Sequence, residues 1–198
     1  MTRDKSLPQT LKTTIEAIRG CRECEGKIPK PNPVIRIHNK AKILIIGQAP
    51  GVKVHESNVP WNDASGKRLR EWMGVSDDEF YNISNIAIVP MGFCYPGKGK
   101  SGDLPPRKEC AAKWHTRVLD HLPNIKTTLL IGNYAQNHYL NDKHKNLTGR
   151  VAAWEDYAPE HFVLPHPSPR NQIWLKRNPW FSESVIPVLQ KAIRQQLN

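Results

Sequence analysis

Short apolar runs alternate along this chain with segments of helical periodicity, and this alternation constrains the fold more than any other feature. The runs predict strands at residues 42–46, 83–89, 127–131 and 162–164. Strands that alternate with helices imply a mainly parallel sheet, because each crossover places a helix on one of its faces. We therefore predict an α/β fold: a three-layer sandwich with a central, mainly parallel four-stranded sheet and helices on both faces.

Helices are predicted where apolar side chains recur at helical spacing, over residues 8–18, 65–73, 109–122, 133–140 and 180–197. Residues 51–61 and the glycine- and proline-rich segment 91–106 are predicted loops. A length of 198 residues suits a single domain over residues 1–198, which is large enough to bury a sizeable core.

Two distinctive turns follow the first and the last predicted strand. Residues 47–51 read GQAPG, and residues 166–171 read HPSPRN. Open α/β sheets build their sites in turns that follow the carboxyl ends of parallel strands. We therefore expect the two turns, although far apart in the sequence, to contribute to one site.

The four cysteines form two pairs. Cys21 and Cys24 are separated by two residues, and Cys94 and Cys110 by fifteen. In a reducing cytosol such a set indicates a metal or a cluster rather than disulfides, because the close pair can present two thiolates and the distant pair can complete the shell. Four unrelated buried cysteines are the alternative. Spacing alone does not separate zinc from a [4Fe-4S] cluster.

The chain is strongly basic, with 29 lysines and arginines, 18 aspartates and glutamates, and a formal net charge of +11. This balance favours a polyanionic partner such as DNA, although a merely soluble basic protein is the alternative. The sequence has no apolar run of membrane-spanning length and no signal-peptide core, so we expect a cytoplasmic protein without membrane contact. The basic loop 98–102 lacks the full P-loop pattern, which argues against nucleotide hydrolysis.

Together, GQAPG, HPSPRN and the four cysteines resemble the uracil-DNA glycosylase superfamily, and in particular its iron–sulfur branches. The resemblance implies a monofunctional DNA glycosylase that flips a base out of DNA and hydrolyses its N-glycosidic bond, leaving an abasic site. The base would be uracil or a modified, 5-substituted pyrimidine, and the setting base-excision repair or antiviral defence. We expect a monomer.

The resemblance further implies a [4Fe-4S] cluster, in preference to zinc. Its cluster-binding elements would be residues 21–24 and 94–110, with Cys21, Cys24, Cys94 and Cys110 as the ligands.

Catalytic roles also follow from the resemblance. His166 would stabilise negative charge on the departing base, and Asp63 would activate the attacking water. The assignment of Asp63 rests on NDASG at residues 62–66, because Ala49 stands where the best-known branch has its aspartate. Asp63 is also a favoured helix N-cap, and both roles can hold together. Gln48 is the alternative, although a neutral amide is a poor base.

The candidate base-binding residues are Asn85, Trp61, Gly51 and Ala49. Asn85 would read the edge of the base and Trp61 would stack on its face. The alternatives are an ordinary strand-end turn residue and a core tryptophan. Gly51 stands where strictly uracil-specific relatives have a tyrosine that blocks groups at pyrimidine C5. A glycine leaves that space open, so we expect 5-substituted pyrimidines to enter.

Residues in and after the second motif are expected to face DNA. The candidates are Ser168, Arg170, Asn171, Trp174, Leu175, Lys176 and Arg177. The basic members would contact phosphates, and Trp174 or Leu175 would fill the gap left by the flipped nucleotide. In the alternative interpretation, the tryptophans of this segment pack onto the core.

Two other classes of function are compatible with the sequence. A non-catalytic nucleic-acid-binding module would keep the fold and lack the water-activating group, which Ala49 favours. A regulatory iron–sulfur protein would need a cluster whose oxidation state alters DNA affinity. The pairing of Asp63 with His166 favours the glycosylase.

Overall fold

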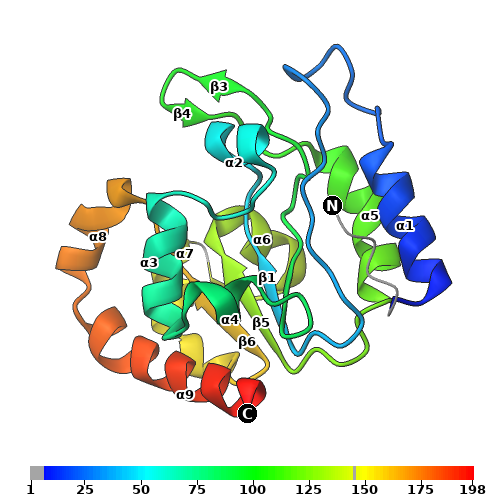
Figure 1. The fold of residues 1–198 in the computed structure, drawn as a ribbon. Coiled ribbons are helices and arrows are strands. Elements are labelled where there is room, and N and C mark those ends of the chain that lie inside the picture. The colour runs from blue at the N-terminus through cyan, green and yellow to red at the C-terminus, as the bar shows by residue number, and fades with distance from the viewer. Residues whose placement is uncertain (1–6, 145) are drawn as a thin grey trace.

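The computed structural model describes residues 7–144 and 146–198, and its centre is a four-stranded sheet (Figure 1). The strands are β1 (Ile43–Ile46), β2 (Ile86–Ile88), β5 (Thr127–Ile131) and β6 (His161–Leu164), in the order β2-β1-β5-β6. All three pairings are parallel. Most strand residues are buried because both faces of the sheet are covered. The predicted α/β fold is confirmed.

Alternate side chains of each strand point to opposite faces and build two cores. Leu44 and Ile46 of β1 belong to one core, and Ile43 and Ile45 to the other. The first core is covered by α1 (Gln9–Arg19), α5 (Lys108–Leu119) and α6 (Gly132–Tyr139). The second is covered by α3 (Ala64–Met73), α4 (Asp77–Tyr81), α7 (Leu147–Ala152) and α9 (Ile186–Leu197).

The strand order creates a switch point between β1 and β5. From β1 the chain runs to β2 on one side, then crosses to β5 and β6 on the other. Ligands of open α/β sheets bind outside the carboxyl ends of the strands at such a point. The two sequence motifs follow β1 and β6, so both leave the sheet at this edge.

Short elements occupy the segments predicted as loops, and those two predictions are corrected. α2 (Val52–Ser57) follows the first motif, while β3 (Lys98–Gly99) and β4 (Gly102–Asp103) form an antiparallel hairpin within 91–106. The only buried residue of α2 is Val54, and each hairpin strand has two residues. Elements this short carry no hydrophobic periodicity that could reveal them.

The second strand begins later than predicted, at Ile86 rather than at residue 83. A turn precedes it, and in this turn the Asn85 carbonyl accepts hydrogen bonds from the backbone N–H groups of Lys42 and Ile43, at the amino end of β1. Asn85 therefore lies at the amino edge of the sheet, opposite the edge that carries the two motifs.

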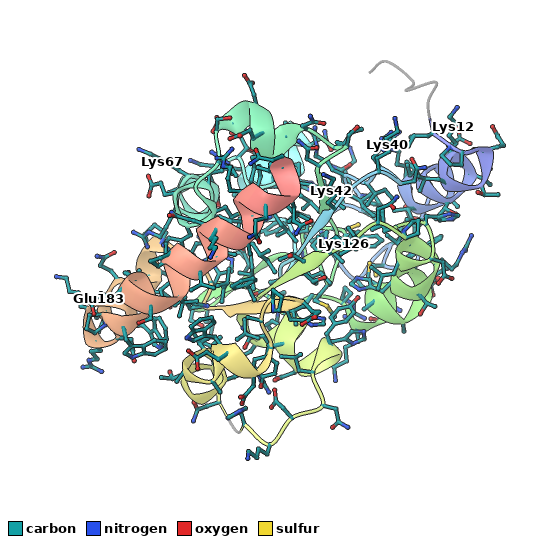
Figure 2. All side chains as sticks on the ribbon, turned by 90° about the horizontal axis from the view of Figure 1, so that it is seen from below. Lys12, Lys40, Lys42, Lys67, Lys126 and Glu183 are labelled. Carbon is teal, nitrogen blue, oxygen red and sulfur yellow. The ribbon has the colours of Figure 1, made fainter. Side chains whose placement is uncertain are left out.

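Part of the positive charge also lies at the amino edge. Lys42 precedes β1 and Lys126 precedes β5, and the Lys126 N–H donates to the Lys42 carbonyl over 2.8 Å. Figure 2, seen from below relative to Figure 1, shows Lys40, Lys42 and Lys126 together on this side. The net charge of +11 is therefore not confined to the motif edge and does not by itself locate a DNA-binding surface.

After the second motif the chain continues as α8 (Gln172–Arg177) and a π-helical turn (Phe181–Val185) that leads into α9. Short 3-10 turns lie at Trp154–Asp156 and Pro169–Asn171. Within the described residues, no helix has the length and apolar character needed to cross a membrane.

Candidate active site

A cavity of about 480 Å³ opens at the carboxyl edge of the sheet. Both motifs, the segment 60–65, the end of β2 and the β3–β4 hairpin contribute to its lining. Cavities of about 300–1,000 Å³ are typical of small-ligand sites. The structure brings together these residues of the predicted site: Gln48, Ala49, Gly51, Trp61, Asp63, His166, Ser168 and Arg170.

Trp61 lines the cavity in a conformation that its surroundings impose. Its φ is 58°, in the left-handed region that bulky residues rarely adopt. A Cβ on Gly66 would lie 1.7 Å from the Trp61 carbonyl oxygen, and a Cβ on Gly47 would lie 2.9 Å from the indole ring. The Trp61 carbonyl also accepts a hydrogen bond of 3.3 Å from Arg70 Nη1. Two glycines therefore make room for this backbone and ring, and the indole becomes a rigid wall.

His166 follows β6 and lines the cavity in a defined tautomer. Its Nδ1 accepts a hydrogen bond of 3.1 Å from the Ser168 backbone N–H. Because that N–H can only donate, the neutral ring carries its proton on Nε2. Burial lowers the pKa of His166, and the nearby Asp63 carboxylate opposes this shift. The centroid of its ring lies 5.7 Å from that of Trp61.

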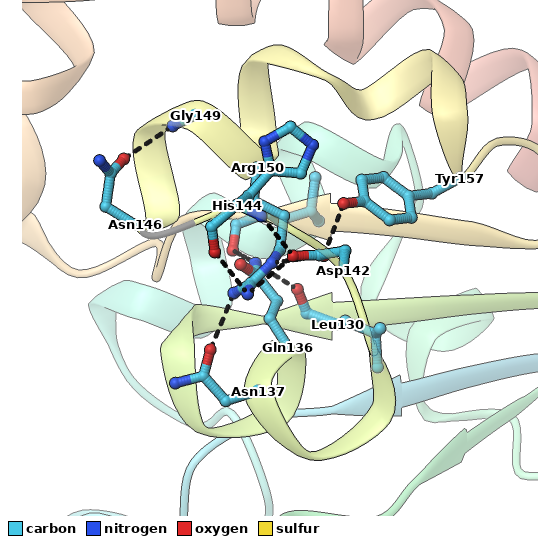
Figure 3. A network of polar contacts seen from close by, with 10 residues as sticks. Leu130, Gln136, Asn137, Asp142, His144, Asn146, Gly149, Arg150 and Tyr157 are labelled. Atoms are coloured by element: carbon cyan, nitrogen blue, oxygen red, sulfur yellow. Dashed lines mark hydrogen bonds and ion pairs between the residues drawn. The ribbon is translucent and has the colours of Figure 1, made fainter.

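The segment that carries His166 is held from both sides. Asn171 Nδ2 donates to the His166 carbonyl over 2.7 Å. The fully buried Gln136 donates from Nε2 to the carbonyls of Leu130 and Leu164, at the ends of β5 and β6 (Figure 3 draws its bond to Leu130). These bonds determine where the chain leaves β6 and enters the second motif.

Asp63 caps the amino end of α3 and also lines the cavity. Its Oδ1 accepts a hydrogen bond of 2.8 Å from the Gly66 N–H, so the predicted N-cap role is confirmed. The charge of this carboxylate acts on His166 and offsets part of the lowering of its pKa by burial. The cap therefore orients an acidic side chain beside the same space that His166 lines.

The first motif contributes Gln48, Ala49 and Gly51 to the lining. Gln48 Nε2 donates to the Leu104 carbonyl over 3.4 Å, which links this motif to the segment after the hairpin. A Cβ added to Gly51 would meet Asp103 Oδ2 at 3.5 Å, an ordinary van der Waals contact. Gly51 and the hairpin thus face each other directly.

Comparison with known families agrees with this geometry. The family model of the uracil DNA glycosylase superfamily matches residues 36–190, which is 155 of the 198 residues. The chain belongs to the uracil DNA glycosylase superfamily. Its members are DNA glycosylases, enzymes that act on DNA, and the cavity with both motifs lies inside the matched range.

Asn85, which was predicted to bind the base, lies outside the cavity. Asn85 is at the amino edge of the sheet and is not part of the cavity lining. β2 runs from Asn85 toward the cavity, and only its far end, at Ile88 and Pro90, reaches the lining. The apolar pattern of residues 83–89 predicts β2 but not the residue at which it begins, and so places Asn85 in the strand rather than before it. We therefore correct the interpretation of Asn85 as the base reader.

The β3–β4 hairpin supplies cavity residues that sequence reasoning missed as part of the base pocket. Lys98, Ser101, Gly102 and Asp103 line the cavity. Arg170 Nη1 donates to the Ser101 carbonyl over 2.8 Å, so the second motif holds the hairpin. The positive φ of Gly102, 146°, requires glycine. The glycines that frame this hairpin were the one local signal of a turn.

α8 exposes a different apolar side chain from those predicted to enter DNA. Trp174 packs with its ring centroid 5.7 Å from that of Phe181, and its Nε1 donates to Thr148 Oγ1 over 2.8 Å. Leu175 also packs against the second core. Ile173, by contrast, is 65% exposed. The core-packing interpretation therefore describes Trp174 and Leu175, and Ile173 is the exposed apolar residue of this helix.

Basic side chains surround the second motif. Arg170, Lys176 and Arg177 are exposed, and Arg68 Nη1 donates to the Ser168 carbonyl over 3.1 Å. Ser168 itself accepts a hydrogen bond at Oγ from the Arg170 N–H, which shapes the turn. Exposed cations beside the cavity are suitable for phosphate contacts, and their role in DNA binding stays a prediction.

The four cysteines line a second, smaller cavity beside α5, together with Arg107 and Lys113. All four are partly buried. Burial raises the pKa of Cys94 to about 11 and that of Cys110 to about 12. Among residues 7–144 and 146–198, no group of three or more His, Cys, Asp or Glu side chains is arranged to hold a metal ion. The thiols therefore surround one space without converging on a single ion.

Proposed function

We propose that this chain is a monofunctional DNA glycosylase that hydrolyses the N-glycosidic bond of uracil or a 5-substituted pyrimidine after base flipping. The observation that carries the proposal is the meeting of Trp61, Asp63 and His166 at one cavity. Base removal needs a place for the extruded base, a group that activates water, and a donor for the charge that develops on the base. These three side chains correspond to those needs.

His166 serves the departing base. In the tautomer imposed by Ser168, its Nε2–H is free to donate to a carbonyl oxygen of the pyrimidine. As the bond from the base to C1′ breaks, its electron pair leaves with the base, and this hydrogen bond strengthens with the growing charge. The lowered pKa of His166 keeps the ring neutral at neutral pH, so the base departs as an anion that the ring stabilises.

Asp63 serves the water. The water oxygen forms the new bond to C1′, and its proton passes to the Asp63 carboxylate. The products are the free base and an abasic site, and no covalent enzyme intermediate is required. The neutral Gln48, in the same lining, is suited to orienting the water. Trp61 stacks on the flipped base, and Ile173 enters the gap that this base leaves in the DNA.

The cysteine cavity is the proposed site of a [4Fe-4S] cluster. The donor set fits in its chemistry, since four thiols from two distant segments line one space. The preference for a cluster over zinc rests on the resemblance of the cysteine pattern to the iron–sulfur branches of the superfamily. Cys21, Cys24, Cys94 and Cys110 would hold the cluster, whose proposed role is structural: it would tie residues 21–24 to Cys94 and to the first turn of α5.

The absence of a side chain at Gly51 supports entry of 5-substituted pyrimidines. Modified pyrimidines of this kind occur in phage DNA, so we infer a role in antiviral defence or in base-excision repair. The two settings differ in the base that is released, which the following experiment measures.

The experiment is base release from labelled oligonucleotides, single- and double-stranded, followed by alkali to cut abasic sites. The panel contains uracil, thymine, hypoxanthine, and 5-hydroxymethylated and glucosylated pyrimidines. We expect release of at least one pyrimidine, lost at least a hundredfold in His166→Ala and in Asp63→Asn. Asn keeps the N-cap hydrogen bond to Gly66, so Asp63→Asn removes the charge without the cap.

Asp78→Asn, an exposed acidic residue of α4, is the matched control and should retain full activity. Thermal melting checks that each variant is folded. Retained DNA binding without base release in the wild type would instead identify a non-catalytic binding module, the function class that Ala49 favours.

A further inference from the structure

The β3–β4 hairpin is built into the cavity as a fixed wall. Arg170 of the second motif donates to the Ser101 carbonyl, and Gln48 of the first motif donates to the Leu104 carbonyl just after β4. A hairpin of two-residue strands has little stability of its own. Its attachment to both motifs therefore couples its position to the groups that hold the base.

The cavity side of this hairpin carries two charges of opposite sign. Lys98 and Asp103 are direct cross-strand partners, so their side chains emerge on the same face, and both line the cavity. The Asp103 carboxylate also acts on the buried Tyr95, whose pKa is raised by burial and by this charge. The hairpin thus presents a hydrogen-bond acceptor, Asp103, and a hydrogen-bond donor, Lys98, next to each other in the cavity lining.

Asp103 lies across the space that the missing side chain of Gly51 leaves open. A Cβ at Gly51 would lie 3.5 Å from Asp103 Oδ2, so no side chain separates the first motif from this carboxylate. A group that enters the space beside Gly51 therefore meets a carboxylate oxygen rather than an apolar surface. Carboxylates accept hydrogen bonds and do not donate them, while the ammonium group of Lys98 only donates.

We propose that Asp103, with Lys98 beside it, selects bases that carry a hydroxyl-bearing substituent toward Gly51. A hydroxyl group both donates and accepts, so it can pair with the carboxylate and the ammonium group at once. Both side chains are exposed to solvent, so a methyl group in the same place would displace water from them without offering a hydrogen bond in return. A 5-hydroxymethyl group is the simplest hydroxyalkyl substituent of this kind on a pyrimidine. This inference rests on the proposed glycosylase function and assigns Asp103 to specificity, not to bond cleavage.

The test compares base release from single-stranded oligonucleotides that contain uracil, thymine or 5-hydroxymethyluracil, each under subsaturating conditions. We expect the wild type to prefer 5-hydroxymethyluracil over thymine, and Asp103→Ala to lower this ratio about tenfold. Asp103→Asn should lower it less, because the amide oxygen still accepts. The rate on uracil should fall less than the rate on 5-hydroxymethyluracil in both variants, because uracil carries no substituent that Asp103 could bind. Lys100→Ala, in the hairpin turn and outside the lining, is the control.

The inference is overturned if the ratio does not change or if all three rates fall together, which would indicate a structural role only. A second readout separates it from the proposed function. In Asp63→Asn protein, which does not cleave, the Kd for the same oligonucleotides should show a preference for 5-hydroxymethyluracil that Asp103→Ala removes. Release of no base from the full panel of the proposed-function experiment would refute the glycosylase, and this binding preference would still decide the role of Asp103.

Discussion

Hydrogen bonds to backbone groups determine the tautomers of two histidines, and the tautomer determines which ring nitrogen of each can donate a hydrogen bond. The Ser168 N–H makes Nδ1 of His166 an acceptor, which leaves Nε2–H for the base. The Pro90 carbonyl can only accept, so His115 carries its proton on Nε2 and receives the Tyr139 hydroxyl at Nδ1. His166 lies at the cavity, whereas His115 is 3% exposed and supports the segment after β2 from behind.

The protein should become less stable as pH decreases, because folding disfavours the protonated form of His115. Burial lowers the pKa of His115 to about 4 from an ordinary 6.5. The unfolded chain therefore binds a proton below pH 6.5 that the folded chain refuses until about pH 4, so stability is lost as pH falls through this window. Between pH 7 and pH 5 we expect a contribution of about 2 kcal/mol from this residue.

Urea unfolding at the two pH values measures this effect. In His115→Gln the decrease in unfolding free energy from pH 7 to pH 5 should be smaller by about 2 kcal/mol than in the wild type. Asn133→Gln, at an exposed polar residue of α6, is the control. An identical pH dependence of the wild type and His115→Gln would contradict the assignment.

At the scale of elements, α7 connects a buried ion pair to α8, the helix that we propose faces DNA. Arg150 of α7 is buried and donates from Nε and Nη2 to the two carboxylate oxygens of Asp142, over 2.8 and 3.2 Å (Figure 3). Tyr157 donates to the same carboxylate over 2.6 Å. Thr148 of α7 in turn accepts from Trp174 of α8. The ion pair therefore helps to set the position of α8.

Removal of one partner of this pair should be strongly destabilising. Asp142→Ala leaves the Arg150 guanidinium, with 6% of its side chain exposed, without its carboxylate. We expect a loss of about 3–5 kcal/mol in the free energy of unfolding, measured by urea denaturation. Replacing both partners by apolar residues, Asp142→Leu with Arg150→Met, should cost less, because no buried charge is then left unpaired.

Asp156→Ala, an exposed acidic residue in the neighbouring 3-10 turn, should change stability by less than about 1 kcal/mol and serves as the control. A loss below about 1 kcal/mol for Asp142→Ala as well would show that this ion pair does not hold α7.

At the scale of the whole molecule, positive charge lies at both ends of the sheet. Lys176 and Arg177 are near the cavity, at the carboxyl edge, while Lys40 and Lys126 are at the amino edge (Figure 2). We expect DNA that places a base in the cavity to reach the first pair and not the second. On this proposal, only part of the net charge of +11 acts in DNA binding.

Salt dependence separates these two parts. Each phosphate contact adds about 0.7 to the slope of log K against log salt for a single strand. We expect the double variant Lys176→Ala with Arg177→Ala to weaken binding and to reduce the slope by about 1 to 1.5, as measured by fluorescence anisotropy of a labelled oligonucleotide. The double variant Lys40→Ala with Lys126→Ala removes the same charge and should leave the slope unchanged. Equal effects of the two variants would place DNA on both edges.

The sequence by itself determined the sheet, the two motif turns and the part of the cavity lining that these turns and the segment 61–63 contribute. Strands such as Thr127–Ile131 are recognisable because their burial on both faces requires apolar residues at nearly every position. His166 lies just after β6 and Asp63 just before α3, so the position of each is a local consequence of chain order.

Only the tertiary structure decided which side chains of the irregular segments reach the cavity. Asn85 precedes the short strand β2 and Asp103 belongs to the short strand β4, yet the first lies at the far edge of the sheet and the second lines the cavity. In α8, Ile173 is exposed while Trp174 packs inward. Elements of two to six residues carry too little hydrophobic pattern to show where they begin or which side faces the core. Their positions are set by contacts with distant parts of the chain, such as those that Arg170 and Gln48 make with the hairpin.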